Sequence, residues 1–144
     1  MTAMKIVHYA TAEQLARCYP LMRALRGRLA DEAQFIAQAQ RQQAQGYRLA
    51  GIEHQGQPAV LAGYRLLENF IHGSFCYVDD LVSDPALRGQ GFGAALLDGL
   101  AVLAREYGCS RMVLDTAISN TRAQAFYQRC GYQALGLHFY RSIV

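Results

Sequence analysis

A glycine-rich segment in the second half of the chain has the residue types and spacing of an anion site. Residues 84–97 read DPALRGQGFGAALL, between an apolar strand-like run and an amphipathic helical pattern. Backbone N–H groups in the first turn of a helix lack intrahelical partners, and the helix dipole favours an anion there. Glycine lets a phosphate approach the backbone closely, and Arg88 can add charge-assisted hydrogen bonds. The segment predicts a pyrophosphate site, with a tight strand-to-helix turn as the structural alternative.

Two other phosphate-binding motifs do not fit this segment. A P-loop reads GxxxxGK[ST], and no lysine follows these glycines. A dinucleotide-binding fold carries GxGxxG after its first strand, whereas residues 89–93 follow several predicted strands. The glycines alone therefore do not identify the ligand.

Two adjacent acids, Asp79 and Asp80, interrupt an apolar run. Unpaired carboxylates are costly in such surroundings. Strand alternation sends neighbouring side chains to opposite faces unless a bulge intervenes. We therefore expect at most one of them to line a substrate cleft, and the other to need a structural partner such as an arginine or backbone amides.

Composition restricts the class of protein. The 144 residues are 52% hydrophobic and 17% charged, which suits one domain with a buried core. No apolar stretch approaches the roughly 20 residues of a membrane span, and no signal peptide is visible. The net charge of +3 comes without a Lys/Arg block. These features predict a cytoplasmic protein with neither a membrane nor a nucleic acid as partner.

Cysteine and histidine spacing argues against a metal site. The four cysteines and four histidines form no CxxC, HxH or HxxxH pattern. Without a secretory signal, reduced and mostly buried thiols are expected. We predict no metal cofactor.

The elements that must position these residues follow from periodicity and capping signals. Capping-box patterns at Thr11 and Asp31, and an N-cap at Asn120, open three of the predicted helices. The sequence predicts strands over 4–9, 47–53, 58–67, 75–83, 111–117 and 132–141, and helices over 12–26, 32–45, 91–107 and 121–130. This order indicates an α/β domain with a mixed sheet, an early hairpin and a late β-α-β crossover.

Two motifs together resemble the GCN5-related N-acetyltransferase (GNAT) family. Arg88-x-x-Gly91-x-Gly93 matches its acyl-CoA signature, (Q/R)xxGx(G/A). Residues 120–132, NTRAQAFYQRCGY, are similar to its second stretch, NxxAxxFYxxxGF. The two occur in the family's order, separated by a helix and a strand, and the similarity covers residues 75–132. The N-terminal half agrees in element order only.

The resemblance implies a single-domain GNAT acyl-CoA N-acyltransferase fold over residues 1–144. Its mixed central sheet would be flanked by helices, and splayed strands at 75–83 and 111–117 would hold acetyl-CoA as co-substrate. Backbone groups of Leu81, Val82 and Ser83 would pair with the pantetheine arm. The pyrophosphate would be held by the amides of Arg88, Gly89, Gln90, Gly91, Phe92, Gly93 and Ala94. Asn120 would meet the pantetheine or phosphate side, a role compatible with its use as an N-cap.

The resemblance also implies catalytic roles. Tyr127, which would lie beside the cofactor, would protonate the departing CoA thiolate, since a phenol is a reasonable acid for a thiol. Relatives similar to polyamine acetyltransferases read Glu-Asp-(Phe/Leu) at 79–81, with the first acid as base. Here that position is Asp79, one methylene shorter, which favours a water relay. Asp80 is the alternative base.

The acceptor is the least readable part of the site. We expect a primary amine of a small molecule, attacking directly in a ternary complex, since no cysteine sits beside a histidine. A protein lysine or N-terminal amine, and an acyl-CoA sensor with little turnover, are the alternatives. Arg23, Arg26 and Arg28 form either a solvated helix end or an acceptor contact. The possibility of a homodimer stays open.

Overall fold

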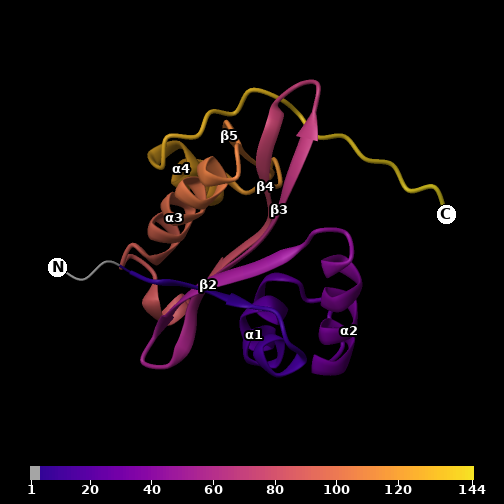
Figure 1. Ribbon diagram of the computed structural model, residues 1–144, viewed down its shortest axis with the longest axis vertical. Helices are drawn as coiled ribbons and strands as arrows, with labels where there is room; N and C mark the ends of the chain where they lie inside the picture. Colours follow the sequence, from indigo (N-terminus) through magenta and orange to yellow (C-terminus); the bar gives the residue numbers. More distant parts are fainter. Residues whose placement is uncertain (1–3) are drawn as a thin grey trace. The chain divides into compact units, whose positions relative to one another are not determined.

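A five-stranded sheet organises the chain. The structure is a computed structural model that describes residues 4–144. The strands lie in the order β1 (Ile6–Tyr9), β2 (Arg48–His54), β3 (Gln57–Asn69), β4 (Gly73–Ser83) and β5 (Arg111–Leu114) (Figure 1). The helices are α1 (Ala12–Leu25), α2 (Glu32–Gln43), α3 (Phe92–Glu106) and α4 (Thr121–Arg129), with a short 3-10 turn at Pro85–Leu87. The chain forms two compact units, which divide between Val113 and Leu114.

The first four strands form an antiparallel meander. Gln55 and Gly56 both have positive φ angles, 53° and 78°, as a two-residue hairpin turn requires. The backbone N–H of Ser110 donates to the carbonyl of Ser74 at 2.9 Å, so β5 begins beside the beginning of β4. The two strands therefore run in the same direction, with α3 as their crossover, and the sheet is mixed, as predicted.

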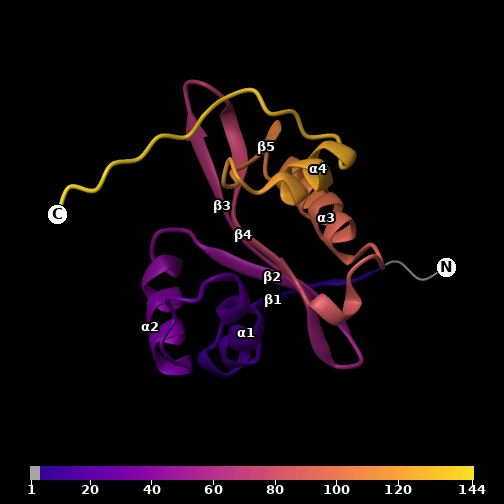
Figure 2. The same ribbon diagram turned by 180° about the vertical axis from the view of Figure 1, so that it is seen from behind.

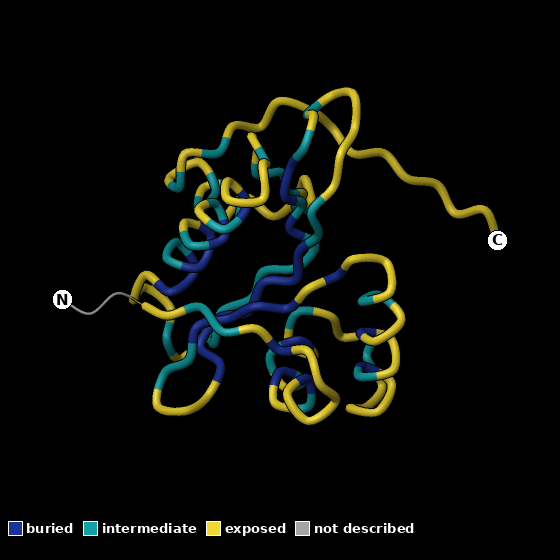
Figure 3. The backbone as a smooth tube through the Cα atoms, in the orientation of Figure 1, coloured by how far each residue is buried: buried dark blue, intermediate teal, exposed yellow. Residues whose placement is uncertain are grey.

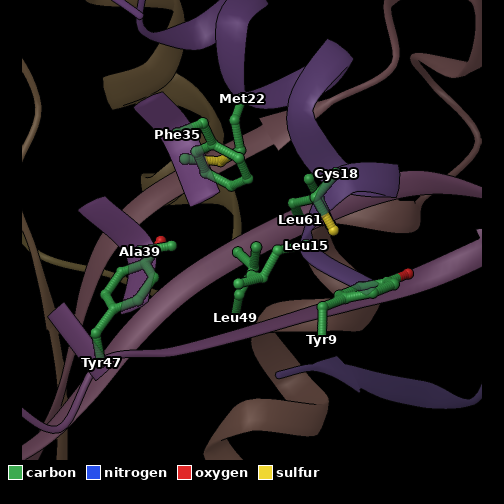
Figure 4. Close-up of a cluster of buried hydrophobic side chains, with 9 residues drawn as sticks. All are labelled: Tyr9, Leu15, Cys18, Met22, Phe35, Ala39, Tyr47, Leu49 and Leu61. Atoms are coloured by element: carbon green, nitrogen blue, oxygen red, sulfur yellow. The ribbon is translucent and has the colours of Figure 1, made fainter. Parts of the chain in front are cut away.

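In the first unit, α1 and α2 cover one face of the sheet and α3 covers the other (Figures 1 and 2). Side chains alternate along each strand, so each strand contributes residues to both faces. Tyr9 joins the core beneath α1 and α2, whereas Ile6 of the same strand meets Gly99 of α3. The core on the α1 and α2 side contains Tyr9, Leu15, Cys18, Met22, Phe35, Ala39, Tyr47, Leu49 and Leu61 (Figure 4). Burial is concentrated along the central strands and the helix faces turned toward them (Figure 3).

The capping residues predicted from the sequence mark where α1 and α2 begin. Thr11 forms the predicted capping box with Gln14. Asp31 caps α2 by accepting from the Gln34 N–H at 2.8 Å, but the Gln34 side chain reaches back to the N–H of Ala30 instead of completing a box. The helix predicted over 32–45 ends two residues earlier, at Gln43, and the turn that follows it includes Gly46, whose φ is 90°.

The predicted strand over 132–141 is wrong, because residues 132–144 form neither helix nor strand. An alternating apolar pattern makes a segment able to form a strand, but a strand exists only where a neighbour completes the hydrogen-bond ladder. In the described structure these apolar side chains are instead exposed: Leu135, Leu137, Phe139 and Tyr140. The strand predicted over 111–117 is also shorter, since β5 ends at Leu114.

None of the helices within residues 4–144 combines the length and the apolar character needed to cross a bilayer.

A close approach of the Tyr47 side chain to β3 depends on glycine. The Tyr47 side chain, which is 5% exposed, passes so near Gly63 that a Cβ there would overlap the phenol oxygen and ring. The absence of a side chain at Gly63 therefore makes the space in which Tyr47 reaches across the sheet.

We predict that Gly63→Ala lowers the free energy of unfolding by about 1–3 kcal/mol, the usual result of overpacking a buried site. Thermal unfolding of the two proteins measures the loss. Gly27→Ala is the matched control, because a Cβ there meets nothing within 4 Å and the backbone φ is not positive. Equal melting temperatures for Gly63→Ala and Gly27→Ala would contradict the packing described here.

Candidate active site

A β-bulge in β4 brings the two adjacent acids to one side. Asp80 pairs with Gly63 of β3, while Val78 pairs with Tyr64, which leaves Asp79 as the extra residue on β4. A bulge interrupts the strict alternation of side chains and re-aims those beside it. Both acids accordingly lie near Tyr47: Asp80 accepts its hydrogen bond, and Asp79 lines the same pocket.

Asp80 is fully engaged by neighbouring side chains. Its Oδ1 accepts from Nε and Nη2 of Arg26 at 3.0 and 2.8 Å, and its Oδ2 accepts from the Tyr47 hydroxyl at 2.9 Å. Burial, followed by the negative charge of Asp80, raises the pKa of Tyr47, so the phenol remains a donor. Arg26 also donates to the backbone carbonyl of Asp79 at 3.0 Å. The sequence analysis required a structural partner for one acid, and Asp80 has one.

Asp79 has an arginine of its own. Nε and Nη2 of Arg65, on β3, donate to its two carboxylate oxygens at 2.9 and 2.7 Å. This bidentate hydrogen bonding raises the pKa of Arg65, whose guanidinium also lies 5.7 Å from the centre of the Tyr77 ring. The pair is partly open to solvent, with the Arg65 side chain 32% and the Asp79 side chain 22% exposed.

The Asp79–Arg65 pair opens into a polar pocket of about 250 Å³. The pocket is lined by Gln42, Gln45, Tyr47, Arg65 and Asp79, all of which belong to the first unit. Of these residues, only Asp79 is among those predicted from the sequence. The β3–β4 hairpin register was the available signal for Arg65, because it places Arg65 opposite Tyr77 and diagonal to Asp79.

The three arginines grouped in the sequence have different surroundings. Arg26, which caps the end of α1, reaches the bulge. Arg23 and Arg28 are exposed, as expected of a solvated helix end.

The glycine-rich turn forms an uncapped helix N-terminus. Gly89 and Gly91 have φ angles of 82° and 84°, a region that favours glycine, and Gly91 is the N-cap of α3. Gly91 makes no side-chain capping hydrogen bond, whereas α1, α2 and α4 are each capped by a side chain. The amides in the first turn of α3 therefore lack the capping oxygen that the other helices have.

The residues predicted to bind the co-substrate around this turn, 81–83 and 88–94, are neighbours in the sequence. Leu81, Val82 and Ser83 end β4 and are partly buried, and the 3-10 turn follows them. Arg88, Gly89, Gln90 and Gly91 are exposed, Phe92 and Gly93 are buried, and Ala94 is partly buried. This arrangement presents exposed loop backbone directly before the helix dipole.

Asn120 and Tyr127 both belong to the second unit, residues 114–144. Asn120 Oδ1 accepts from the Ala123 N–H at 3.0 Å, which confirms its predicted N-cap role. The partly buried Tyr127 ring lies 5.5 Å from that of Phe126 and 6.1 Å from that of Tyr132. The carbonyl of Tyr127 also accepts from the Tyr132 N–H at 2.9 Å, closing the end of α4.

Within residues 4–144, no three His, Cys, Asp or Glu side chains are grouped so as to hold a metal ion.

Comparisons with known proteins agree on one family. The family model described as "Acetyltransferase (GNAT) family" matches residues 9–132. Glucosamine 6-phosphate N-acetyltransferase of Trypanosoma brucei brucei is 36% identical over 58 residues, which are 40% of this chain but only 37% of that relative.

Solved structures share the fold over nearly the whole chain. AAC(6')-Iy in complex with the bisubstrate analog CoA-S-monomethyl-acetylneamine matches with a TM-score of 0.81 at 19% identity, covering 99% of this chain and 100% of that one. A ribosomal-protein-alanine N-acetyltransferase of Brucella melitensis matches with a TM-score of 0.82, also at 19% identity, with coverage of 99% and 100%. The fold and the family match together place this chain in the GNAT acetyltransferase family.

Proposed function

We propose that this chain is an N-acetyltransferase that transfers the acetyl group of acetyl-CoA to a primary amine of a small molecule. One observation carries the proposal. The strand β4 has two acids at a bulge, and it is followed by the helix α3, whose glycine-rich N-terminus has no side-chain cap. The first supplies a carboxylate for an amine, and the second supplies amides for a phosphate. Membership of the GNAT family supports acetyl-CoA as the donor.

In this proposal the backbone holds the co-substrate. The amides of residues 88–94 and the Arg88 side chain bind the pyrophosphate, and Asn120 contributes from the start of α4. Leu81, Val82 and Ser83 pair with the pantetheine arm as an added strand would. The lengths of the strands support this pairing: β4 has 11 residues and β5 has four, and the two begin at the same end. The last residues of β4 therefore extend beyond its neighbour.

The chemistry needs a base before attack and an acid after it. Asp79, which opens into the polar pocket, accepts a proton from the acceptor ammonium directly or through water. The amine lone pair then forms the new C–N bond while the carbonyl π electrons move onto oxygen. When the C=O bond re-forms, the C–S bond breaks and Tyr127 protonates the departing thiolate. The remaining extra proton on nitrogen passes to the Tyr127 phenolate or to water, which leaves the neutral amide. Asp80 is the weaker candidate for the base, because its side chain is less exposed than that of Asp79, 12% against 22%, and it does not line the pocket.

Direct transfer is favoured over transfer through either of the two buried cysteines. Burial raises the pKa of both Cys18 and Cys76 to about 12, so these thiols are poor nucleophiles. Both side chains are 0% exposed.

A protein amine is the second candidate acceptor. A ribosomal-protein-alanine N-acetyltransferase has the same fold, which is the observation in favour of a protein acceptor. The pocket of about 250 Å³ beside Asp79 favours a small molecule instead. That residues 1–144 act as one cytoplasmic catalytic domain, as a monomer or a homodimer, stays a prediction.

An acceptor screen tests the proposed function. We predict that acetyl-CoA with a panel of amino sugars, aminoglycosides, amino acids, polyamines and peptides gives CoA thiol release that depends on a small amine. A thiol reagent detects the released CoA, and mass spectrometry identifies the acetylated product. A reaction without acetyl-CoA corrects for the partly exposed Cys109 and Cys130. Binding of acetyl-CoA without release by any acceptor would contradict the enzyme and support the sensor alternative. Release by peptides alone would favour the protein-amine alternative.

We predict that Gly91→Ala raises the Kd for CoA by about tenfold or more, because a methyl group obstructs the approach of the phosphate. Isothermal titration calorimetry measures the Kd. Gly108→Ala is a close control: its φ is 88° against 84° for Gly91, and in both places a Cβ meets nothing within 4 Å. Both variants bear a similar backbone cost of about 1–2 kcal/mol. If Gly91→Ala bound CoA as tightly as Gly108→Ala, the phosphate assignment would fail.

We predict that Tyr127→Phe lowers kcat by about 10²-fold or more and leaves the Kd for CoA nearly unchanged, because the change removes only the acidic hydroxyl. Steady-state kinetics with the best acceptor from the screen provides the measurement. Tyr132→Phe, which removes a hydroxyl from the neighbouring ring, is the control. An unaltered kcat in Tyr127→Phe would exclude Tyr127 as the acid.

A further inference from the structure

The pocket beside Asp79 is built from segments far apart in the sequence. Gln42 and Gln45 come from the end of α2 and the turn after it, and Tyr47 immediately precedes β2. Arg65 and Asp79 come from β3 and from the bulge of β4. The lining is polar throughout, and one of its members is the carboxylate proposed as the base. The pocket is therefore the place where an acceptor would meet that base.

Both acids at the bulge are neutralised by arginines. Asp79 is paired with Arg65 at 2.7 Å, and Asp80 with Arg26 at 2.8 Å. The four side chains carry two positive and two negative charges, so they sum to zero. A polyamine needs unpaired carboxylates for its additional ammonium groups, and in this pocket it would meet the Arg65 guanidinium instead.

Arg65 can also contact a ligand. A guanidinium has five N–H donors, of which the Asp79 pair uses one on Nε and one on Nη2. With about a third of its side chain exposed at the pocket, Arg65 can direct further donors to a hydroxyl, carboxylate or phosphate oxygen.

The two glutamines extend this preference for ligand oxygens and hydroxyls. Gln42 Oε1 accepts from Gln38 Nε2 at 2.9 Å, which holds the Gln42 amide in place on α2. Amide side chains both donate and accept, so they suit hydroxyl groups, and they add no negative charge that would attract a polycation.

We infer that Arg65 is a specificity-determining residue. By neutralising Asp79 and offering donors at the same pocket, it selects a monoamine that carries hydroxyl or anionic groups, as an amino sugar phosphate does, over a polyamine. This inference rests on the proposed acetyltransferase function of the same site.

The test compares glucosamine 6-phosphate with spermidine as acceptors for three variants and the wild type. For the wild type, kcat/KM is expected to be higher with the amino sugar phosphate. In Arg65→Gln, the ratio of kcat/KM for spermidine to that for glucosamine 6-phosphate should rise about tenfold or more, because Asp79 is left unpaired. Arg65→Lys, which keeps the charge, should largely retain the wild-type preference.

Arg17→Gln is the matched control. Arg17 is also paired with a carboxylate, Glu53, at 2.9 Å and has a similar exposure of 40%, but it does not line the pocket. Its loss should leave the acceptor ratio unchanged. An equal shift in Arg17→Gln would show a general charge effect and overturn the inference, as would an unshifted ratio in a folded Arg65→Gln.

A binding measurement separates this inference from the proposed function. Calorimetric titration of the CoA-bound protein with each amine reports the pocket's preference whether or not acetyl transfer occurs. Amino sugar phosphate binding that is lost in Arg65→Gln, with no turnover of any amine, would support the inference and contradict the enzyme. Turnover of amines with tighter spermidine binding in the wild type would support the enzyme and overturn the inference.

Discussion

The site depends on the electrostatic cost of two carboxylates at adjacent positions of one strand. Asp79 and Asp80 repel one another where the apolar core begins, so each needs a cation within hydrogen-bonding distance. Arg65 and Arg26 supply those cations from opposite directions, one from the neighbouring strand and one from the end of α1. The bulge makes this double pairing possible, because without it the two side chains would face opposite sides of the sheet.

Several other features follow from that arrangement. Tyr47 completes the partners of Asp80, and it reaches Asp80 only because Gly63 has no side chain in its path. Arg26 also bonds the Asp79 carbonyl, so the end of α1 is attached to the bulge itself. The connection between α1 and α2 is thereby held beside the proposed acceptor pocket. Residues that a sequence reader would assign to a helix end and to a core thus take part in the geometry of the site.

The proposed co-substrate site rests on a different principle, backbone amides at a helix start that no side chain caps. Thr11, Asp31 and Asn120 each cap a helix with a side-chain oxygen, and α3 begins with Gly91 instead. The loop before it directly follows β4, so the acids and the amides proposed to bind phosphate lie within one continuous stretch of chain. The segment from β4 to α3 therefore carries both the proposed base and the amides proposed to bind phosphate.

Much of this could be predicted from the sequence, because the relevant interactions are local. The capping residues, the hairpin at Gln55 and Gly56, and the glycine turn at residues 89–93 depend on neighbours within a few positions. The predicted strand at 132–141 failed for the opposite reason. Its apolar alternation is a local property, but a strand also needs a hydrogen-bonding partner from elsewhere in the chain.

By itself, then, the sequence determined the order of elements as far as α4, the family motifs, and the acids and glycines that the proposed chemistry uses. Only the tertiary structure decided how Asp79 and Asp80 are partnered. Arg65 is 14 residues from Asp79, and Arg26 is 54 residues from Asp80. The first pairing depends on the register of a hairpin with a bulge, and the second on where a helix end packs against the sheet. Neither pairing follows from sequence spacing alone, because the register of a bulged hairpin and the packing of a helix end on a sheet are both fixed in the folded chain.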